Sequence, residues 1–414
     1  MNIPSNAVSL ASAGLIAATL AMPASAANVG TDIADAFKNG QFNVDFRYRY
    51  EFVDQDSFAD DANASTLRTR LVFKSAEYKD FFVTINMDDV RTIGNGNYNS
   101  TRNGKTGYPV VADPKGTDLN LASVTYTGLD GGTIVAGRQR IIRGNSRFIG
   151  NVGWRQNEQT YDAATIDYAV TDKLQVFYGY VGEVKRIFGP DEGTPAASWN
   201  SDSHLINASY VFSPLFNLSA YAYLLDFDEA PASSSETYGI RLDGKGDFSD
   251  DLSFTYALEY ADQGDYKDNP ADYSESYYLL EAGLGMGIFG ATAGYEVLSG
   301  DGTDSFQTPL ATLHKFNGLA DQFLTTPVGG LEDMYLKATA KALGGSFMVV
   351  YHDFSQETGS ADYGSEIDFI AKWKFLENYS VLAGFGLFDV DNNAPATGPQ
   401  NDVDKIWLQL GASF

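Results

Sequence analysis

The 414-residue sequence contains no cysteine, only three histidines and few basic residues. The lack of cysteine excludes disulfide bridges, thiolate metal sites and cysteine nucleophiles. Its 54 acidic and 28 basic residues give a formal net charge of −26, so nucleic acid is not an expected partner, because its phosphates would be repelled overall. The histidines do not cluster with serine or aspartate, and we therefore expect no enzyme, no metal site and no cofactor.

The sequence also lacks any run of about 20 apolar residues that could form a membrane-spanning helix. Residues 1–26 have a different character, because a run of small and apolar residues from Val8 to Met22 is followed by Ala24-Ser25-Ala26, a small-x-small cleavage pattern. We predict a secretory signal peptide over 1–26 and one mature domain over 27–414. A short transmembrane helix is the alternative, but this apolar run is too short to span a bilayer.

Aromatic residues and glycine are abundant, with 25 Tyr, 27 Phe and 41 Gly, which is typical of a β-rich chain with many tight turns. Within 41–52, the aromatic residues at positions 46, 48, 50 and 52 alternate with the charged residues at positions 47, 49 and 51, and a strand separates these onto two faces. The same pattern predicts eighteen strands, near 41–52, 66–77, 80–91, 118–128, 132–140, 160–170, 173–182, 202–212, 216–226, 236–246, 251–262, 273–284, 288–298, 332–342, 345–356, 363–375, 378–389 and 403–414.

The predicted connections alternate between short turns, such as 129–132, and long loops, such as 141–159 and 299–331. Bacterial outer-membrane barrels have short periplasmic turns, long extracellular loops and an even number of strands. The chain ends in an apolar alternation that finishes on Phe414, which resembles the signal read by the barrel-assembly machinery. We predict an all-β protein, a single closed antiparallel transmembrane β-barrel of about 18 strands, in the bacterial outer membrane among lipid and lipopolysaccharide.

Arginine is concentrated in the first half, where 12 of the 13 residues lie at or before Arg186. Guanidinium groups stay charged and bind carboxylates in a bidentate way, and a row of weak sites suits conduction. The period of two predicts six pore-lining, substrate-binding side chains: Arg47, Arg49, Arg68, Arg70, Arg138 and Arg140. The alternative is a solvated wall in which these arginines form ion pairs with Glu51, Asp88 or Asp167.

Two further features bear on the lumen. The later strands carry acidic residues at inward positions, so an electric field is predicted to run across the pore. These acidic residues are Glu259, Glu281, Glu296, Glu366 and Asp368.

The loop 141–159 combines apolar residues with three arginines, which is unusual for an exposed loop. We predict that it folds inward as a constriction formed by Arg143, Arg147, Trp154 and Arg155, with packing against a neighbouring loop as the alternative.

Three stretches, Thr66–Leu71, Gly137–Gln139 and Arg147–Gln156 followed by Thr160–Ala163, resemble the alginate-export family of outer-membrane porins. The resemblance implies an eighteen-stranded monomeric barrel with an arginine-lined lumen for an acidic polysaccharide. The mixed or acidic second half departs from a uniformly basic lumen. We therefore expect a passive pore for an anionic saccharide such as alginate or uronate oligosaccharides. The alternatives are a general diffusion porin for small polar solutes and a structural or adhesive surface barrel.

The sequence leaves several questions open. It does not give the exact substrate, import or export, monomer or trimer, or which long loop narrows the lumen. Acidic loop residues such as Asp54 and Asp56 are expected to be solvated, with weak calcium binding as the alternative.

Overall fold

The computed structural model describes residues 33–414. The predicted signal peptide and the first residues of the predicted mature domain lie outside the described residues. A short helix, α1 (Ile33–Lys38), precedes the first strand. Within the described part of the chain, no helix is both long and apolar enough to cross a membrane.

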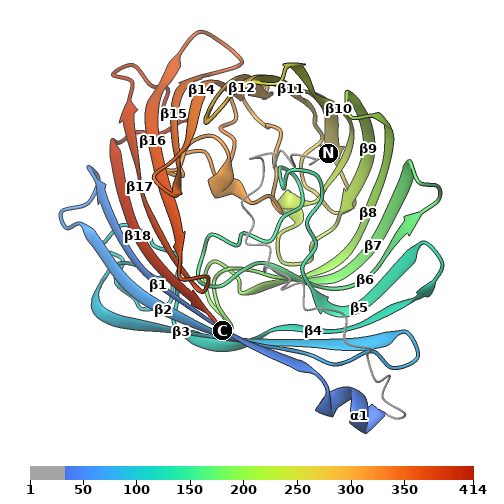
Figure 1. Cartoon of the computed structure of the whole chain (residues 1–414). Helices are drawn as coiled ribbons and strands as arrows, with labels where there is room; N and C mark the ends of the chain where they lie inside the picture. Colours follow the sequence, from blue (N-terminus) through green and yellow to red (C-terminus); the bar gives the residue numbers. More distant parts are fainter. Residues whose placement is uncertain (1–32) are drawn as a thin grey trace.

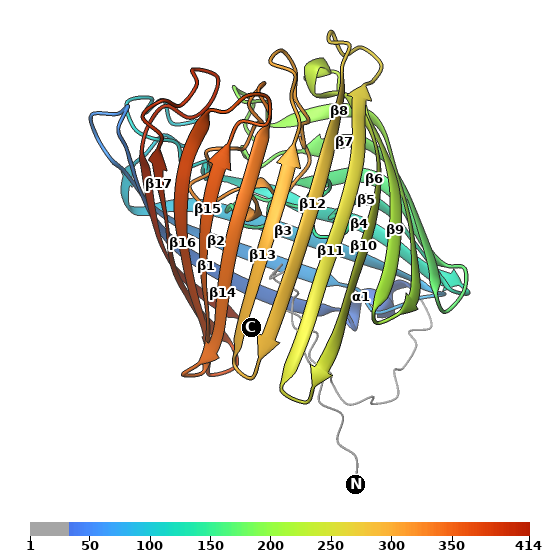
Figure 2. The same cartoon turned by 90° about the horizontal axis from the view of Figure 1, so that it is seen from above.

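Eighteen antiparallel strands form one closed sheet, in which β1 pairs with both β2 and β18. Closure leaves no unpaired sheet edge, which a backbone in lipid requires because lipid offers no hydrogen bonds. The predicted barrel is confirmed (Figures 1 and 2). The strands are β1 (Gln41–Gln55), β2 (Ala62–Lys74), β3 (Phe81–Asn97), β4 (Gly116–Leu129), β5 (Gly132–Gln139), β6 (Thr160–Ala169), β7 (Leu174–Lys185), β8 (Ser198–Ser213), β9 (Phe216–Leu225), β10 (Ser235–Ser249), β11 (Leu252–Asp265), β12 (Ser274–Met286), β13 (Phe289–Leu298), β14 (Leu331–Ala342), β15 (Gly345–Ser355), β16 (Asp362–Phe375), β17 (Tyr379–Val390) and β18 (Val403–Ser413).

Several strands extend beyond the predicted bounds at their loop ends. β2 begins at Ala62 and β3 continues to Asn97, several residues past the apolar alternation. The two extensions pair with each other, with Asn63 opposite Asn97. Hydrogen bonding between neighbouring strands therefore continues where the side-chain pattern no longer signals a strand.

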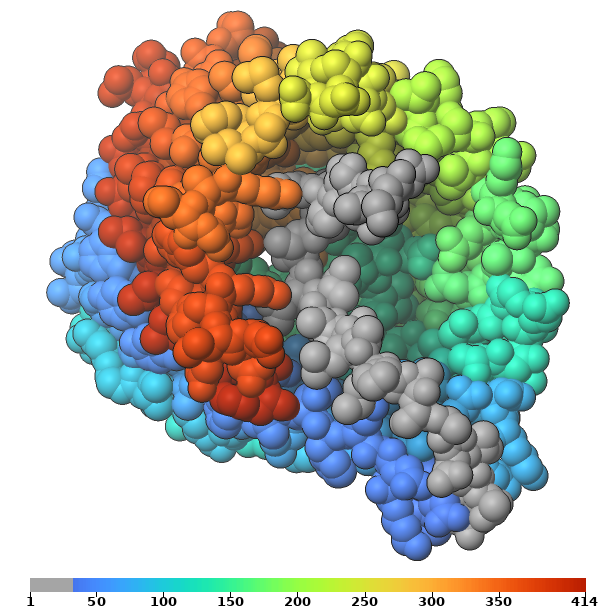
Figure 3. Space-filling view, viewed as in Figure 1, coloured from blue at the N-terminus to red at the C-terminus, as the bar shows by residue number. Residues whose placement is uncertain are grey.

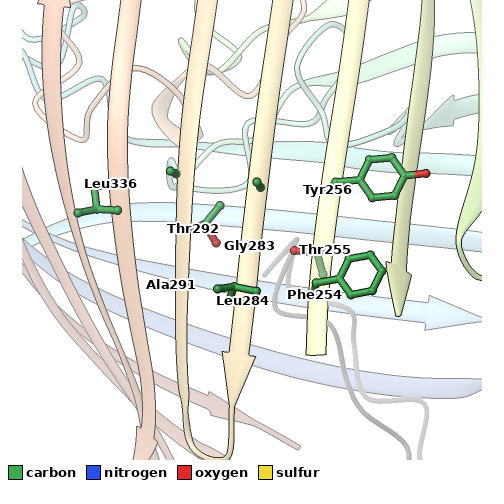
Figure 4. A pocket seen from close by; sticks show the side chains of 10 residues that line it. Phe254, Thr255, Tyr256, Gly283, Leu284, Ala291, Thr292 and Leu336 are labelled. Atoms are coloured by element: carbon green, nitrogen blue, oxygen red, sulfur yellow. The ribbon is translucent and has the colours of Figure 1, made fainter. Parts of the chain in front are cut away.

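The outward face of the sheet is apolar along most strands. Leu280, Leu284 and Leu336 are more than half exposed, and the period of two keeps such residues on one face. Figure 4 shows a hollow of this outer surface, where Phe254, Tyr256, Leu284 and Leu336 surround small residues. Because its exposed lining is almost wholly apolar and lies on the outward face, this hollow contacts lipid and has no part in solute passage.

The interior of the barrel holds two long loops, 140–159 between β5 and β6, and 299–330 between β13 and β14 (Figure 1). Figure 3 shows the strand wall enclosing a hollow. The loops are joined to each other, because Gly150 N donates to Leu310 O at 2.8 Å and Thr312 N donates to Ser146 O at 3.0 Å. Both loops therefore narrow the interior together.

Replacing Leu280 by Arg places a charge in the middle of the apolar belt on β12. We expect a loss of about 2–4 kcal/mol in the free energy of unfolding, the cost of a cation at the membrane midplane. Urea unfolding in lipid vesicles measures this change in the free energy of unfolding. The matched change Leu343→Arg lies in the exposed turn between β14 and β15, and an effect there as large as that of Leu280→Arg would contradict this assignment of the lipid belt.

Candidate pore constriction

Four arginines form a patch on the inner wall at β1 and β2. Arg47 lies directly opposite Arg68 in the register, and Arg49 and Arg70 are each two residues away on the same inward faces. All four are buried, with exposed fractions of 9% or less. These four side chains thus share the buried face of β1 and β2.

The loop 140–159 covers this arginine patch. Arg47 donates from Nε to Gln156 Oε1 at 2.9 Å and from Nη1 to the Gly153 carbonyl at 2.8 Å. The Arg49 guanidinium lies 4.3 Å over the ring of Trp154 and donates to Gln409 Oε1 at 2.7 Å. The arginine wall is therefore separated from open water by the loop that it holds.

Three ion pairs neutralise part of this positive charge. Arg70 makes two hydrogen bonds to Asp88, at 2.7 and 2.6 Å. Arg155 contacts both carboxylate oxygens of Glu51, at 3.1 and 3.0 Å. A weaker contact of 3.4 Å joins Arg143 to Asp167. The alternative interpretation named these three acidic residues, but only Asp88 pairs with one of the predicted pore-lining arginines. Glu51 and Asp167 pair with arginines of the loop 140–159.

Arg47 and Arg68 differ from their neighbours in lacking a carboxylate. Among residues 33–414, no carboxylate oxygen lies within 4.0 Å of either guanidinium group. Arg49 approaches Asp113 only at 3.9 Å, and Arg68 Nε has no hydrogen-bond partner in that part of the chain. A buried charge without a partner is screened weakly, so these groups give the constriction a positive potential.

Arg140 follows the end of β5 and is the most accessible of the predicted inward arginines. Its side chain is 32% exposed, and its Nε donates to Glu158 Oε2 at 2.7 Å. The guanidinium group of Arg143 lies 3.9 Å over the ring of Phe177. Direct contact with a solute inside the barrel is therefore best supported at Arg140.

The prediction that Arg138 lines the lumen is wrong. Arg138 shares a face of β5 with Ile134 and Ala136, which are exposed as on the lipid side, whereas its neighbour Gln139 is buried and bonds to Thr165 inside the barrel. Arg138 instead makes two hydrogen bonds to Asp162, at 2.8 and 2.9 Å. Both faces of β5 carry small and apolar residues, so its sequence alone does not show which face is inward.

The inward fold of 140–159 rests on one aromatic anchor and one ionic anchor. Phe148 contacts the rings of Tyr221 and Tyr277 at 5.1 and 5.3 Å. Arg147 donates to Glu296 Oε1 at 2.8 Å and to Asn317 Oδ1 at 3.0 Å. Burial would lower the pKa of Arg147, but Glu296 and Tyr277 together outweigh burial and raise that pKa. The loop therefore folds inward and also packs on the second loop, so both interpretations hold.

The second loop is held on an acidic part of the wall at β16, which is three strands from β1 around the barrel. Ala320 N donates to Glu366 at 2.6 Å, and Leu319 N donates to Asp368 at 3.2 Å. The turn that aims these amides has positive φ at Asn317 and Gly318, and a Cβ at Gly318 would collide with the Glu366 carboxylate. Two acidic residues predicted to face inward thus bind the loop backbone.

Asp321 joins the two loops to the wall. Its carboxylate contacts His314 Nδ1 at 2.7 Å, Lys405 Nζ at 2.7 Å and Arg155 Nη2 at 3.3 Å. Burial would raise the pKa of Asp321, but the neighbouring His314 and Lys405 outweigh it and hold that pKa well below its usual range. The carboxylate is therefore ionised at neutral pH and binds the loops across β18.

Sequence reasoning missed the loop acids Asp113, Glu158 and Asp321, since no local pattern reveals which arginine a loop carboxylate meets. Glu158 contacts both Arg70 and Arg140. Across residues 33–414, no group of acidic, histidine or cysteine side chains has an arrangement that could hold a metal ion. The chemistry of this region is therefore that of charged and hydrogen-bonding side chains.

The model of a protein family described as alginate export matches residues 39–301, nearly two thirds of the chain. The chain belongs to the alginate export family. No curated protein matches it. The match extends over β1 to β13 and includes the arginine patch and the loop 140–159, so the family suggested by the sequence stretches is confirmed.

Solved structures share the fold at low identity. OccAB4 of Acinetobacter baumannii has a TM-score of 0.72 and 14% identity, over 91% of this chain and 98% of that one. OccAB2 of the same species has a TM-score of 0.73 and 13% identity, over 92% of this chain and 99% of that one. OpdO of Pseudomonas aeruginosa has a TM-score of 0.69 and 15% identity, over 92% of this chain and 98% of that one. Family and fold together make the chain a bacterial outer-membrane pore, a channel and not an enzyme.

Replacing Arg155 by Gln leaves the fully buried Glu51 without its cation. Loss of one partner of a buried ion pair costs about 3 kcal/mol, and we expect the loop 140–159 to detach from the wall. Limited trypsin digestion of the folded barrel then cuts at Arg143 or Arg147. The exposed Arg91→Gln serves as the control, and equal resistance of both variants would contradict this anchoring.

Proposed function

We propose that this pore passes anionic carbohydrate, such as alginate or uronate oligosaccharides, down its concentration gradient. The observation that carries the proposal is the cationic patch of Arg47, Arg49 and Arg68, which is buried on the inner wall and only partly matched by carboxylates. In a chain with a net charge of −26, these buried charges form a local positive region that attracts anions.

The positive region acts mainly through its field. The loop 140–159 covers Arg47 and Arg49. A sugar carboxylate in the lumen is therefore attracted by their electrostatic potential without contacting their side chains directly. At an effective dielectric constant of about 20, a charge about 10 Å away contributes roughly 1.7 kcal/mol. Several such contributions favour an anion without a single deep binding well, which conduction requires. Arg140 supplies the accessible guanidinium for direct contact.

A general diffusion porin for small polar solutes is the second candidate. It is favoured by the acidic wall of β13, β14 and β16, where Glu296, Asp333, Glu366 and Asp368 are buried. Ion pairs also neutralise Arg70 and Arg155. In that case the two walls shape a transverse field and make no selective site for sugars. A large conductance without saccharide-dependent blocking would distinguish this candidate.

Single-channel current in planar bilayers, with uronate oligosaccharides added, tests the proposal. We expect oligosaccharide-dependent blocking events in the wild type. Replacing Arg68 by Gln should shorten them about threefold to tenfold, because one nearby charge contributes roughly 1–2 kcal/mol before screening by salt. Arg68 is the suitable position because it makes no ion pair within 33–414 that the change would break.

The matched control is Arg138→Gln, the same substitution on the outward face of the barrel. Its blocking events should equal those of the wild type. Steady conductance without blocking in the wild type would overturn the proposal and leave the general diffusion porin. Equal shortening in both variants would show that the arginine wall has no special part in it.

A further inference from the structure

Glu158 occupies a carboxylate-binding site made by two strand residues, Arg70 on β2 and Asn120 on β4, and by two residues of its own loop, Arg140 and Asn151. Arg70 Nη2 donates to its Oε1 at 2.7 Å and Arg140 Nε donates to its Oε2 at 2.7 Å. Two amides complete the site, with Asn151 Nδ2 donating to Oε2 at 2.8 Å and Asn120 Nδ2 donating to Oε1. Guanidinium and amide donors around one carboxylate are the groups that recognise a uronate carboxylate.

Arg70 does not depend on Glu158 alone for its charge balance. Arg70 already has both carboxylate oxygens of Asp88, at 2.7 and 2.6 Å. The Glu158 side chain is only 2% exposed, whereas that of Arg140 is 32% exposed. The site is thus filled on its inner side by Glu158 and reaches water through Arg140.

Glu158 remains ionised in this position. Burial would raise its pKa, but the charges of Arg70 and Arg140 outweigh burial and hold that pKa well below its usual range. Glu158 lies in the loop 140–159, outside the strand ladder. A rotation of the Glu158 side chain or a shift of the 151–158 segment would therefore withdraw its carboxylate, while Arg70 on β2, Asn120 on β4 and Arg140, next to the end of β5, stay in place.

We propose that Glu158 is a built-in competitor of the anionic substrate. Its carboxylate fills the site formed by Arg70, Arg140, Asn120 and Asn151, and a uronate carboxylate displaces it when the saccharide passes. This inference rests on the proposed function for the identity of the substrate. The carboxylate site itself rests only on the contacts of Glu158. Competition keeps the site from holding a sugar tightly, which favours release over retention.

The test is Glu158→Gln, which keeps the shape of the side chain and removes its charge. We expect the chloride-over-potassium permeability ratio, measured as a reversal potential across a potassium chloride gradient, to rise about threefold or more, because Arg140 loses its carboxylate partner. Blocking events of uronate oligosaccharides should lengthen by a similar factor. The control Glu183→Gln removes the same charge from the outward face of β7 and should change neither quantity.

A second variant keeps the test decisive if Glu158→Gln fails to fold. Arg140→Gln removes the accessible guanidinium at the edge of the lumen and should lower the chloride preference and shorten blocking events. An unchanged chloride preference in either folded variant overturns the inference, as does an equal change in Glu183→Gln. A changed chloride preference with no uronate block in any protein supports the carboxylate site and contradicts the proposed substrate.

Discussion

Lipid cannot hydrogen-bond the protein backbone, and this constraint determines the rest of the structure. It requires the sheet to close on itself, as β1 does by pairing with β18. Closure divides every strand into a lipid face and a lumen face, and the period of two assigns each side chain to one of them. Polar and charged residues on the inward face are therefore forced into one enclosed space, where they must find partners or remain uncompensated.

The two inward loops supply partners for much of this enclosed charge. The loop 140–159 brings Glu158 to the arginine wall, and the loop 299–330 brings backbone amides to the acidic wall through Leu319 and Ala320. Asp321 and Arg155 connect the two loops. The walls are matched incompletely, however, because Arg47 and Arg68 have no carboxylate within 4.0 Å among residues 33–414. The positive charges of Arg47 and Arg68 are therefore the basis of the proposed preference of the pore for anions.

Much of the fold could be predicted from the sequence because each strand carries its own signal. Arg47, Arg49, Arg68 and Arg70 alternate with aromatic or aliphatic residues, so their inward positions follow from parity. Arg138 could not be placed in this way, because β5 has small and apolar residues on both faces.

The partners that the loops supply to the arginines could not be predicted. Asp321 meets Arg155 from 166 residues away, and Asp113 lies near Arg49 from another loop. Such contacts depend on how the loops pack inside the closed barrel, and no local sequence pattern indicates this packing. The sequence thus indicates which charges each strand carries, but not how far loop residues neutralise them.

The most direct measurement of the central claim is the reversal potential of the wild-type pore across a potassium chloride gradient. Net charge alone, at −26, favours potassium. If the partly unmatched arginine wall dominates the constriction, chloride will permeate better than potassium, and the preference will weaken as salt screens the field. A preference for potassium at low salt would contradict the account, because the acidic wall and the acidic loops would then control passage.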